Sequence, residues 1–347
     1  MTADALTPAP IAYRWDLDKT YLRTEFDTVK DLLKIAVERA KDKRTVPGAS
    51  SLIREIQATA PQGIYIVSGS PTQLRRVLEA KLRLDGVKWS GLVLKPQLRN
   101  ILRGRFRFVK DQVGYKLAAL FESRVTMDPS VLEVMFGDDA EADAFIYSLY
   151  ADVCTGRVGI DVLQAVLESA GVYEDVVPTI LEHAGKVARG GGALRIFIHL
   201  DRVSEPGEFD LLGGRVVPFH NYLQPALVLV EAGVLTAAAA CRVACELLGE
   251  HGFTGDALAA SYLDLLGRGH LGGDAARAIA AHVRGSDEST FGRDAAGMHA
   301  FVEALAAHKA MDAPEIAEAI LPDIDWVASF GKDRARAKAA KKRAMGR

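Results

Sequence analysis

The first two-thirds of the chain alternates short apolar runs with longer stretches whose apolar residues recur at helical spacing. This alternation predicts an α/β protein, with a Rossmann-like parallel sheet and helices on both of its faces. The predicted strands are 11–15, 64–67, 91–94, 131–136 and 194–200, and the predicted helices are 29–40, 50–58, 73–84, 117–123 and 145–153.

The pattern changes after about residue 215, where the chain becomes rich in Ala and Leu at helical spacing, interrupted by glycines. We therefore expect an α/β core over 9–217, an all-helical C-terminal region over 218–330 and a basic tail over 331–347. The stretch from Lys332 to Arg347 holds eight Lys and Arg residues and one Asp, which is typical of a solvated helix or a frayed tail.

The composition of the 347-residue chain is that of a globular protein, with 49% hydrophobic and 25% charged residues. It excludes a disordered, collagen-like or disulfide-scaffold protein. The net charge of −2 means that any argument for a nucleic-acid or membrane partner has to be local.

Three cysteines fit a reducing cytosol. The N-terminus lacks the basic start and apolar core of a signal peptide, and the most apolar stretch, 225–248, carries charged residues. We expect a cytoplasmic protein without a transmembrane segment, associated peripherally with a membrane if its substrate is a lipid.

The strongest chemical signal is Asp-Leu-Asp-Lys-Thr at 16–20, directly after the first predicted strand. Two carboxylates, Asp16 and Asp18, at the carboxyl end of a parallel strand suit Mg²⁺ and phosphoryl chemistry. One can attack phosphorus and the other can move a proton to or from the leaving group. The alternative is a polar turn after a strand.

A second signal is Ser-Gly-Ser-Pro at 68–71, after the second predicted strand. Ser70, Pro71 and Gln73 have the pattern of a capping box that opens a helix. Ser68 and nearby backbone N–H groups would then lie at a helix N-terminus, where anions bind. The alternative is an ordinary capped helix.

A third signal is an acidic run after the strand predicted at 131–136, in which Asp138 and Asp143 are candidate metal ligands. The alternative is a helix N-terminus enriched in acids. Lys116, predicted to open a helix, can stabilise the charge of a phosphoryl group, although a lone lysine is usually solvent-exposed. His199, at the end of the strand predicted at 194–200, can approach the same edge, but we favour a structural role for it.

In this order along the chain, the four signals resemble the motifs of the haloacid dehalogenase (HAD) superfamily. The closest likeness is to the catalytic domain of the actin-patch, lipin-like phosphatidate phosphatases, whose pattern has Pro-Gly before a helix, S-x-S-P and G-D-S-G-E-x-D. The matching residues are Pro-Gly at 47–48, Ser-Gly-Ser-Pro at 68–71 and Gly-Asp-Asp-Ala-Glu-Ala-Asp at 137–143. The likeness covers roughly residues 11–155 and leaves out the C-terminal third.

The resemblance implies a role for each matching residue and a HAD-type sheet. Asp16 resembles the nucleophile that forms an aspartyl-phosphate, Asp18 the general acid and base, and Thr20 a support of the first motif. The implied phosphate-binding residues are Ser68, Gly69 and Lys116, and the implied Mg²⁺ ligands are Asp16, Asp18, Asp138 and Asp143. The chain departs from the lipin-like pattern at Lys19, Asp139 and Ala140, and none of these departures removes a catalytic group.

Two features bear on the substrate. Only 43 residues, 21–63, separate the first two motifs, so we expect a small or absent cap and an open site that suits a macromolecular or membrane-borne phosphate. The segment between Arg75 and Lys116 holds twelve Lys and Arg residues against three acidic ones, a local charge of +9. It can attract an anionic membrane surface or another polyanion, or it can be a solvated face.

These features predict a Mg²⁺-dependent phosphomonoester hydrolase, with phosphatidate-like lipid as one candidate substrate. One alternative is a HAD phosphatase for nucleic-acid ends or a soluble phosphometabolite. Another is a non-catalytic HAD-fold interaction protein whose helical third recruits a partner.

Overall fold

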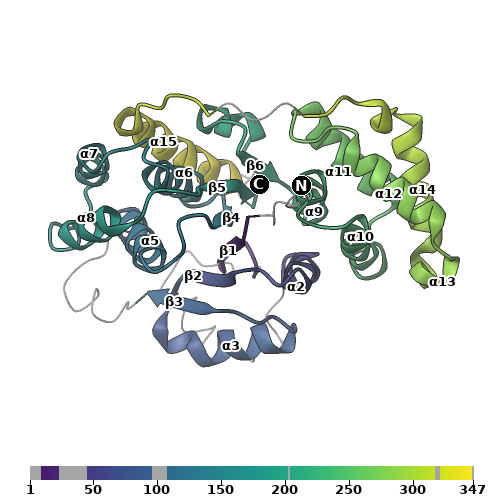
Figure 1. The fold of residues 1–347 in the computed structure, drawn as a ribbon, viewed down its shortest axis with the longest axis horizontal. Helices are drawn as coiled ribbons and strands as arrows, with labels where there is room; N and C mark the ends of the chain where they lie inside the picture. The colour runs from purple at the N-terminus through teal and green to yellow at the C-terminus, as the bar shows by residue number, and fades with distance from the viewer. Residues whose placement is uncertain (1–8, 23–44, 96–107, 202–203, 317–320, 346–347) are drawn as a thin grey trace, which may run out of the picture.

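The computed structural model describes residues 9–22, 45–95, 108–201, 204–316 and 321–345. Within these ranges the chain forms an α/β structure with one six-stranded, all-parallel sheet and thirteen α-helices (Figure 1). The strands are β1 (Ile11–Asp16), β2 (Gly63–Pro71), β3 (Gly91–Lys95), β4 (Leu132–Asp138), β5 (Ala193–His199) and β6 (Val216–Phe219). The predicted parallel sheet is confirmed. β6 was not predicted, because it is short and its proline is typical of a sheet edge.

The order of the strands creates a point at which the chain reverses direction across the sheet. The order is β3-β2-β1-β4-β5-β6, so the chain runs from β1 to one edge and later from β4 to the other. In open parallel sheets of this kind, ligands bind outside the carboxyl ends of the strands at the reversal point. Residues 16–20, 68–71 and 137–143 follow or end the three strands that meet there.

Side chains alternate between the two faces of each strand. Trp15 and Phe136, paired in register on β1 and β4, stack on the first face with ring centroids 3.7 Å apart. Met135 and Ile196 point to the second face and belong to a separate apolar cluster. The long apolar runs in the sequence therefore reflect a sheet that is buried on both sides.

Two sets of helices cover these faces (Figure 1). The first face is covered by α2 (Ala49–Ala58), α3 (Arg75–Leu84) and α9 (Leu223–Glu231), and the layer continues through α10 (Ala237–His251), α11 (Gly255–Gly267), α12 (Asp274–Gly285), α13 (Glu288–Phe291) and α14 (Ala295–Ala307). The second face is covered by α5 (Phe108–Arg124), α6 (Asp143–Cys154), α7 (Ile160–Ala170), α8 (Val177–Lys186) and α15 (Trp326–Met345).

The helices predicted at 50–58, 73–84 and 145–153 correspond to α2, α3 and α6, and the helix predicted at 117–123 is the second part of α5. The helix predicted at 29–40 lies outside the described residues. The prediction that Lys116 opens a helix was wrong. It lies inside α5, because that helix already begins at Phe108.

The C-terminal region shares its apolar core with the sheet. Tyr222 lies 5.9 Å from Trp15, centroid to centroid, and belongs to the same buried cluster as residues of α9 to α12 and α14. β6 spans the boundary predicted at 217. None of the described helices combines the length and the hydropathy needed to cross a bilayer.

Residues 331–345 of the predicted basic tail are helical and continue α15, so they are not a frayed end, and this helix is solvated only in part. Trp326 and Phe330, earlier on α15, are buried against Phe145 of α6. Asp333 and Arg336, within the predicted tail itself, are also buried. The charge pattern misled because a buried Arg paired with Asp looks in sequence like any other charged pair.

Candidate active site

The first part of the site is the end of the central strand β1. Asp16 is the last residue of the strand, and its side chain is 2% exposed. Neither carboxylate oxygen has a hydrogen-bond partner within the described part of the chain. Buried polar atoms are normally satisfied, so two orphaned carboxylate oxygens indicate a site for a group that the chain itself does not provide.

The second part is the corner between β4 and α6. Asp138 ends β4, and its Oδ1 accepts hydrogen bonds from the backbone N–H groups of Ala140 (2.6 Å) and Glu141 (3.1 Å). Asp143 opens α6, and its Oδ2 accepts from the backbone N–H of Asp138 (3.2 Å). A Cβ at Gly137 would lie within 2.4–2.8 Å of Asp143, so only glycine permits this close approach.

The two parts bring three carboxylates together. One oxygen each from Asp16, Asp138 and Asp143 lies within 4.8 Å of the others, and all three residues are buried. Such a group repels itself unless a cation offsets its charge. Carboxylate oxygens are the ligands that hard divalent cations prefer, so the donor set and the orphaned Asp16 oxygens fit a metal ion.

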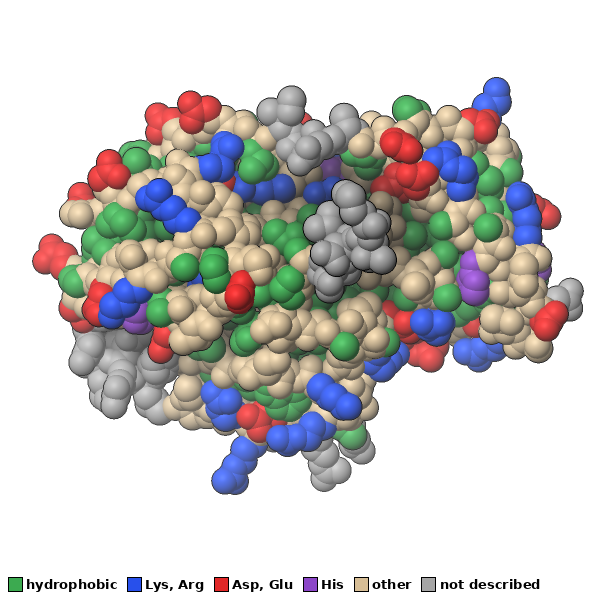
Figure 2. Space-filling view, viewed as in Figure 1, with side chains coloured by type: hydrophobic (Ala, Val, Ile, Leu, Met, Phe, Trp, Pro, Cys, Tyr) green, Lys and Arg blue, Asp and Glu red, His purple; other side chains and the backbone are tan. Residues whose placement is uncertain are grey.

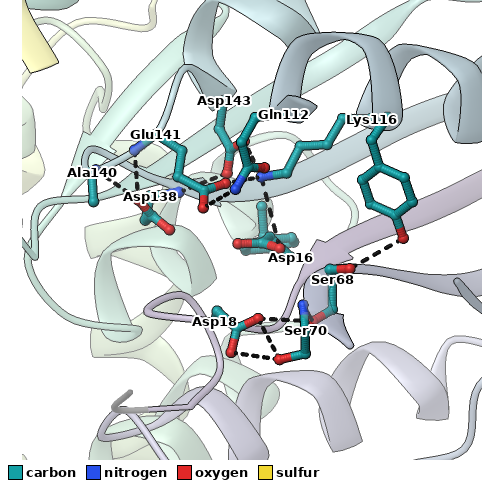
Figure 3. Close-up of polar contacts among 12 residues, drawn as sticks. Asp16, Asp18, Ser68, Ser70, Gln112, Lys116, Asp138, Ala140, Glu141 and Asp143 are labelled. Carbon is teal, nitrogen blue, oxygen red and sulfur yellow. Dashed lines mark hydrogen bonds and ion pairs between the residues drawn. The ribbon is translucent and has the colours of Figure 1, made fainter. Parts of the chain in front are cut away.

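Lys116 of α5 brings a buried positive charge to these carboxylates. Its Nζ contacts Asp143, lies 2.7 Å from Glu141 Oε2 and 3.8 Å from Asp16 Oδ1, and the side chain is fully buried. Gln112, one turn earlier on α5, donates from Nε2 to Glu141 Oε1 at 2.5 Å. Figure 3 shows Asp16 facing this group on one side and Asp18 with its serine partners on the other.

Asp18 lies apart from the three-carboxylate cluster. Its Oδ2 accepts hydrogen bonds from Ser68 Oγ (2.8 Å) and Ser70 Oγ (2.9 Å), the two hydroxyls at the end of β2 (Figure 3). Ser68 Oγ also accepts from the backbone N–H of Ser70. The structure thus brings the first and second motifs together through Asp18.

The predicted capping box at Ser70 was wrong. β2 continues to Pro71, a 3₁₀ turn follows at Thr72–Leu74, and no side chain caps either helical segment. Ser70 instead uses its hydroxyl on Asp18. The Ser70 side chain, which the local pattern predicted to cap a helix, therefore bonds to a residue that is distant in the sequence.

Burial controls the protonation of these groups. Burial and the neighbouring carboxylates raise the pKa of Asp16 and of Asp138 well above the usual range, although Lys116 opposes this. Burial raises the pKa of Asp18, against hydrogen bonds from Ser68 and Ser70 that lower it. Burial lowers the pKa of Lys116, but Asp143, Asp16 and Glu141 raise it by more, so the lysine stays charged.

Two residues that the sequence did not single out as site residues support the loop after β1. His199 Nδ1 donates to the carbonyl of Lys19 at 2.8 Å, and Tyr222 Oη donates to the carbonyl of Thr20 at 2.5 Å. Lys19 has a left-handed backbone with φ 59°, so the loop is held in a conformation that non-glycine residues seldom adopt. The partner of Tyr222 lies 202 residues away in sequence, so no local signal could have revealed it.

The other residues predicted from the sequence have different surroundings. The Thr20 hydroxyl is buried with no hydrogen-bond partner in the described part of the chain. Gly69 is half-buried in β2, where an added Cβ would approach the Gln112 amide to 3.4 Å. Half-buried residues around the carboxylates include Asp18, Lys19, Gly69, Ala140 and Glu141.

Part of the basic segment lies on α3. Figure 2 shows Lys and Arg side chains gathered over α3 at one edge of the molecule, with acidic side chains between them. The ion pairs there are Arg75 and Arg83 with Glu79, and Lys81 with Asp85. Residues 96–107, which carry four of the twelve basic residues, lie outside the described part of the chain.

No protein-family model, curated protein or solved structure matches this chain. The geometry of the site is therefore what indicates its chemistry.

Proposed function

We propose that this protein is a metal-dependent phosphomonoester hydrolase of the HAD type, which forms an aspartyl-phosphate on Asp16. The observation that carries the proposal is the state of Asp16. It is a buried carboxylate that forms no hydrogen bond with the described residues, at a switch point of the sheet, facing Lys116, Asp138 and Asp143. A nucleophile needs free lone pairs and nearby positive charge, and Asp16 has the first from its isolation and the second from Lys116.

In the first step, an Asp16 oxygen attacks phosphorus and the bond from phosphorus to the ester oxygen breaks. The leaving oxygen needs a proton, and Asp18 is the candidate donor. Its raised pKa keeps a proton on it to higher pH than on an ordinary aspartate, and Ser68 and Ser70 fix its orientation. Lys116 stabilises the negative charge that gathers between Asp16 and the phosphoryl group.

In the second step, Asp18 takes a proton from water as the water oxygen attacks phosphorus. The bond between phosphorus and Asp16 breaks, which releases inorganic phosphate and restores the carboxylate. The same residue therefore acts first as an acid and then as a base.

Asp16, Asp138 and Asp143 would hold the cation, and we propose Mg²⁺ because all three ligands are hard carboxylate oxygens. The bound ion would supply positive charge that offsets the substrate phosphate and the acidic cluster. Asp18 lies outside this group in the structure, so we assign it to proton transfer and leave it out of the proposed ligand set.

We extend the proposal to the class of phosphomonoester that the protein hydrolyses. Phosphatidate-like lipid is our first candidate because of the family resemblance and the basic residues over α3. Nucleic-acid ends and soluble phosphometabolites are the alternatives with the same chemistry.

The test is phosphate release from a panel of substrates with Mg²⁺ and with EDTA. The panel contains p-nitrophenyl phosphate, phosphatidate in mixed micelles, nucleotides and end-phosphorylated oligonucleotides. We expect Mg²⁺-dependent turnover that Asp16→Asn abolishes, and that Asp18→Asn lowers by about 10²–10⁴-fold. The Asp18→Asn variant should still bind Mn²⁺ with near-wild-type affinity, because the Asp18 carboxylate lies outside the cluster of Asp16, Asp138 and Asp143.

Arg343→Lys, at a position of α15 whose side chain is 40% exposed, is the matched control and should leave turnover unchanged. Turnover that survives in folded Asp16→Asn would refute the covalent mechanism. Absence of turnover on every substrate, from folded and metal-loaded protein, would favour the non-catalytic interaction protein.

A further inference from the structure

Arg336 on α15 reaches the metal-ligand corner from the far end of the chain. Its Nη1 donates to the carbonyl of Asp139 at 3.0 Å and its Nη2 donates to the carbonyl of Glu141 at 3.1 Å. Its Nη1 also donates to Ser204 Oγ at 3.2 Å. Only 9% of the residue is exposed. One guanidinium thus bridges two carbonyls in the loop between Asp138 and Asp143.

Because the peptide bond is planar, the contact of Arg336 with the Asp139 carbonyl also affects Asp138, a candidate metal ligand. In a planar trans peptide, the C=O and the following N–H point in opposite directions. The carbonyl of Asp139 and the N–H of Ala140 belong to one peptide unit. When Arg336 holds that carbonyl on its side of the loop, the N–H must face the other side, where it donates to Asp138 Oδ1 at 2.6 Å.

The helix that carries Arg336 is itself anchored to the same corner. Trp326 and Phe330 pack edge-on against Phe145, with centroids 5.4 and 5.5 Å away, and Phe145 lies in the first turn of α6 next to Asp143. In Figure 1 α15 runs alongside α6. The position of Arg336 therefore depends on packing around the very turn that carries the ligands.

The residues around Arg336 hold its guanidinium in one orientation and also offset its charge. Its Nε donates to Asp333 Oδ1 at 3.1 Å on the same helix, and its Cζ lies 4.6 Å from the centroid of the Phe209 ring. A lysine ammonium can replace the charge but cannot span two carbonyls with a planar fork.

We propose that Arg336 is a positioning residue for the metal site, and that α15 completes this site by clamping the loop between Asp138 and Asp143. The inference rests on the proposed function for the presence of a metal ion, whereas the clamping of the loop by Arg336 can be tested without the metal. Outer-shell contacts of this kind orient first-shell ligands, and their removal typically lowers metal affinity about 10–100-fold.

The test compares wild type, Arg336→Lys and the matched control Arg343→Lys in the full chain. Arg343 lies seven residues later on the same helix and pairs with Glu208 at 2.6 Å. Two quantities are measured: the Kd for Mn²⁺ by titration calorimetry, and the hydrogen exchange of the Ala140 and Glu141 amides. We expect Arg336→Lys to raise the Mn²⁺ Kd about 10-fold or more and to speed exchange at both amides. Arg343→Lys should change neither.

A folding control keeps the result interpretable. Arg336→Lys retains a charge beside Asp333, so it does not leave a buried carboxylate unpaired. If it fails to fold, Arg336→Gln combined with Asp333→Asn removes both charges together and is measured in the same way.

Unchanged Mn²⁺ affinity in a folded Arg336 variant would overturn the proposal, even if its melting temperature fell, since Arg336 would then only stabilise the fold. If wild type binds no Mn²⁺, the metal in the proposed function fails and amide exchange alone decides the clamp. Faster exchange in the Arg336 variant would support the clamp, and unchanged exchange would overturn it.

Discussion

Two aspartates separated by one residue have opposite environments in this site. Asp16 is buried and, among the residues that the structure describes, neither of its oxygens has a hydrogen-bond partner, whereas both oxygens of Asp18 accept from serine hydroxyls. Hydrogen bonds fix the orientation of Asp18, and isolation leaves the lone pairs of Asp16 available. This contrast fits the proposed roles of Asp16 as nucleophile and Asp18 as proton-transfer partner.

The raised pKa values predict how stability and metal binding depend on pH. Asp16 and Asp138 have folded-state pKa values above the unfolded value of about 3.9, so the folded protein holds protons that the unfolded chain has already lost. The metal-free protein therefore loses stability as pH rises through these raised values. A cation replaces the protons, so its stabilising effect should grow with pH.

Thermal melts with Mn²⁺ and with EDTA, between about pH 5 and about pH 8, measure this difference. We expect the Mn²⁺-dependent rise in Tm to increase steadily across the range. Asp16→Asn should reduce the increase, because it removes one of the titrating ligands. A rise in Tm that is constant or larger at low pH would contradict the assignment of these carboxylates as ligands.

At the scale of elements, the corner between β4 and α6 depends on Gly137, which has no side chain. Gly137 has ordinary backbone dihedrals, so its importance lies in space rather than in strain. The strand must pass so close to Asp143 that its carboxylate can accept from the backbone of Asp138. Two of the candidate ligands, Asp138 and Asp143, are thus brought together where a strand and a helix meet.

Gly137→Ala should displace the Asp143 carboxylate, since the new Cβ would otherwise lie 2.4 Å from Oδ2. We expect the Mn²⁺ Kd to rise at least about 10-fold and the free energy of unfolding to fall by about 1–3 kcal/mol. Calorimetry and urea unfolding give the two quantities. Gly185→Ala is the matched control, because nothing lies within 4 Å of its added Cβ. Equal behaviour of the two variants would refute the argument.

At the scale of the whole molecule, the helical C-terminal region and the sheet form one structure. Trp15, Phe136 and Tyr222 stack in succession across their boundary, and the buried cluster continues into α9 to α12 and α14. Tyr222 also holds the loop after β1, while Arg336 holds the loop after β4. The C-terminal third therefore contacts the backbone on both sides of the site.

We expect a single cooperative unfolding transition. Both buried apolar clusters contain residues from before and after residue 217, so neither part buries its apolar side chains without the other. Far-ultraviolet circular dichroism follows the helices, and near-ultraviolet circular dichroism follows the stacked aromatic residues. Their urea midpoints should coincide. Two separate transitions would mean that the region after residue 217 unfolds independently of the sheet.

Much of the fold could be predicted because strand and helix periodicities are local properties. The runs at 11–15, 64–67 and 131–136 are buried on both sides, which makes them mostly apolar, and polar residues follow where parallel strands end. The two charged residues inside these runs, Arg14 and Glu133, form a buried ion pair with each other. The candidate ligands Asp16 and Asp138 could be identified in the same way, from their positions at strand ends.

Contacts between distant segments decided the rest. Ser70 has the sequence pattern of a helix cap but donates to Asp18, and β6 is too short and too proline-interrupted to give a signal. Arg336 looked like part of a solvated tail, although its partners lie 195–197 residues earlier in the loop. A local pattern records which groups can bond, but only packing determines which of them meet, because a polar side chain takes whichever partner lies within reach once its neighbours are buried.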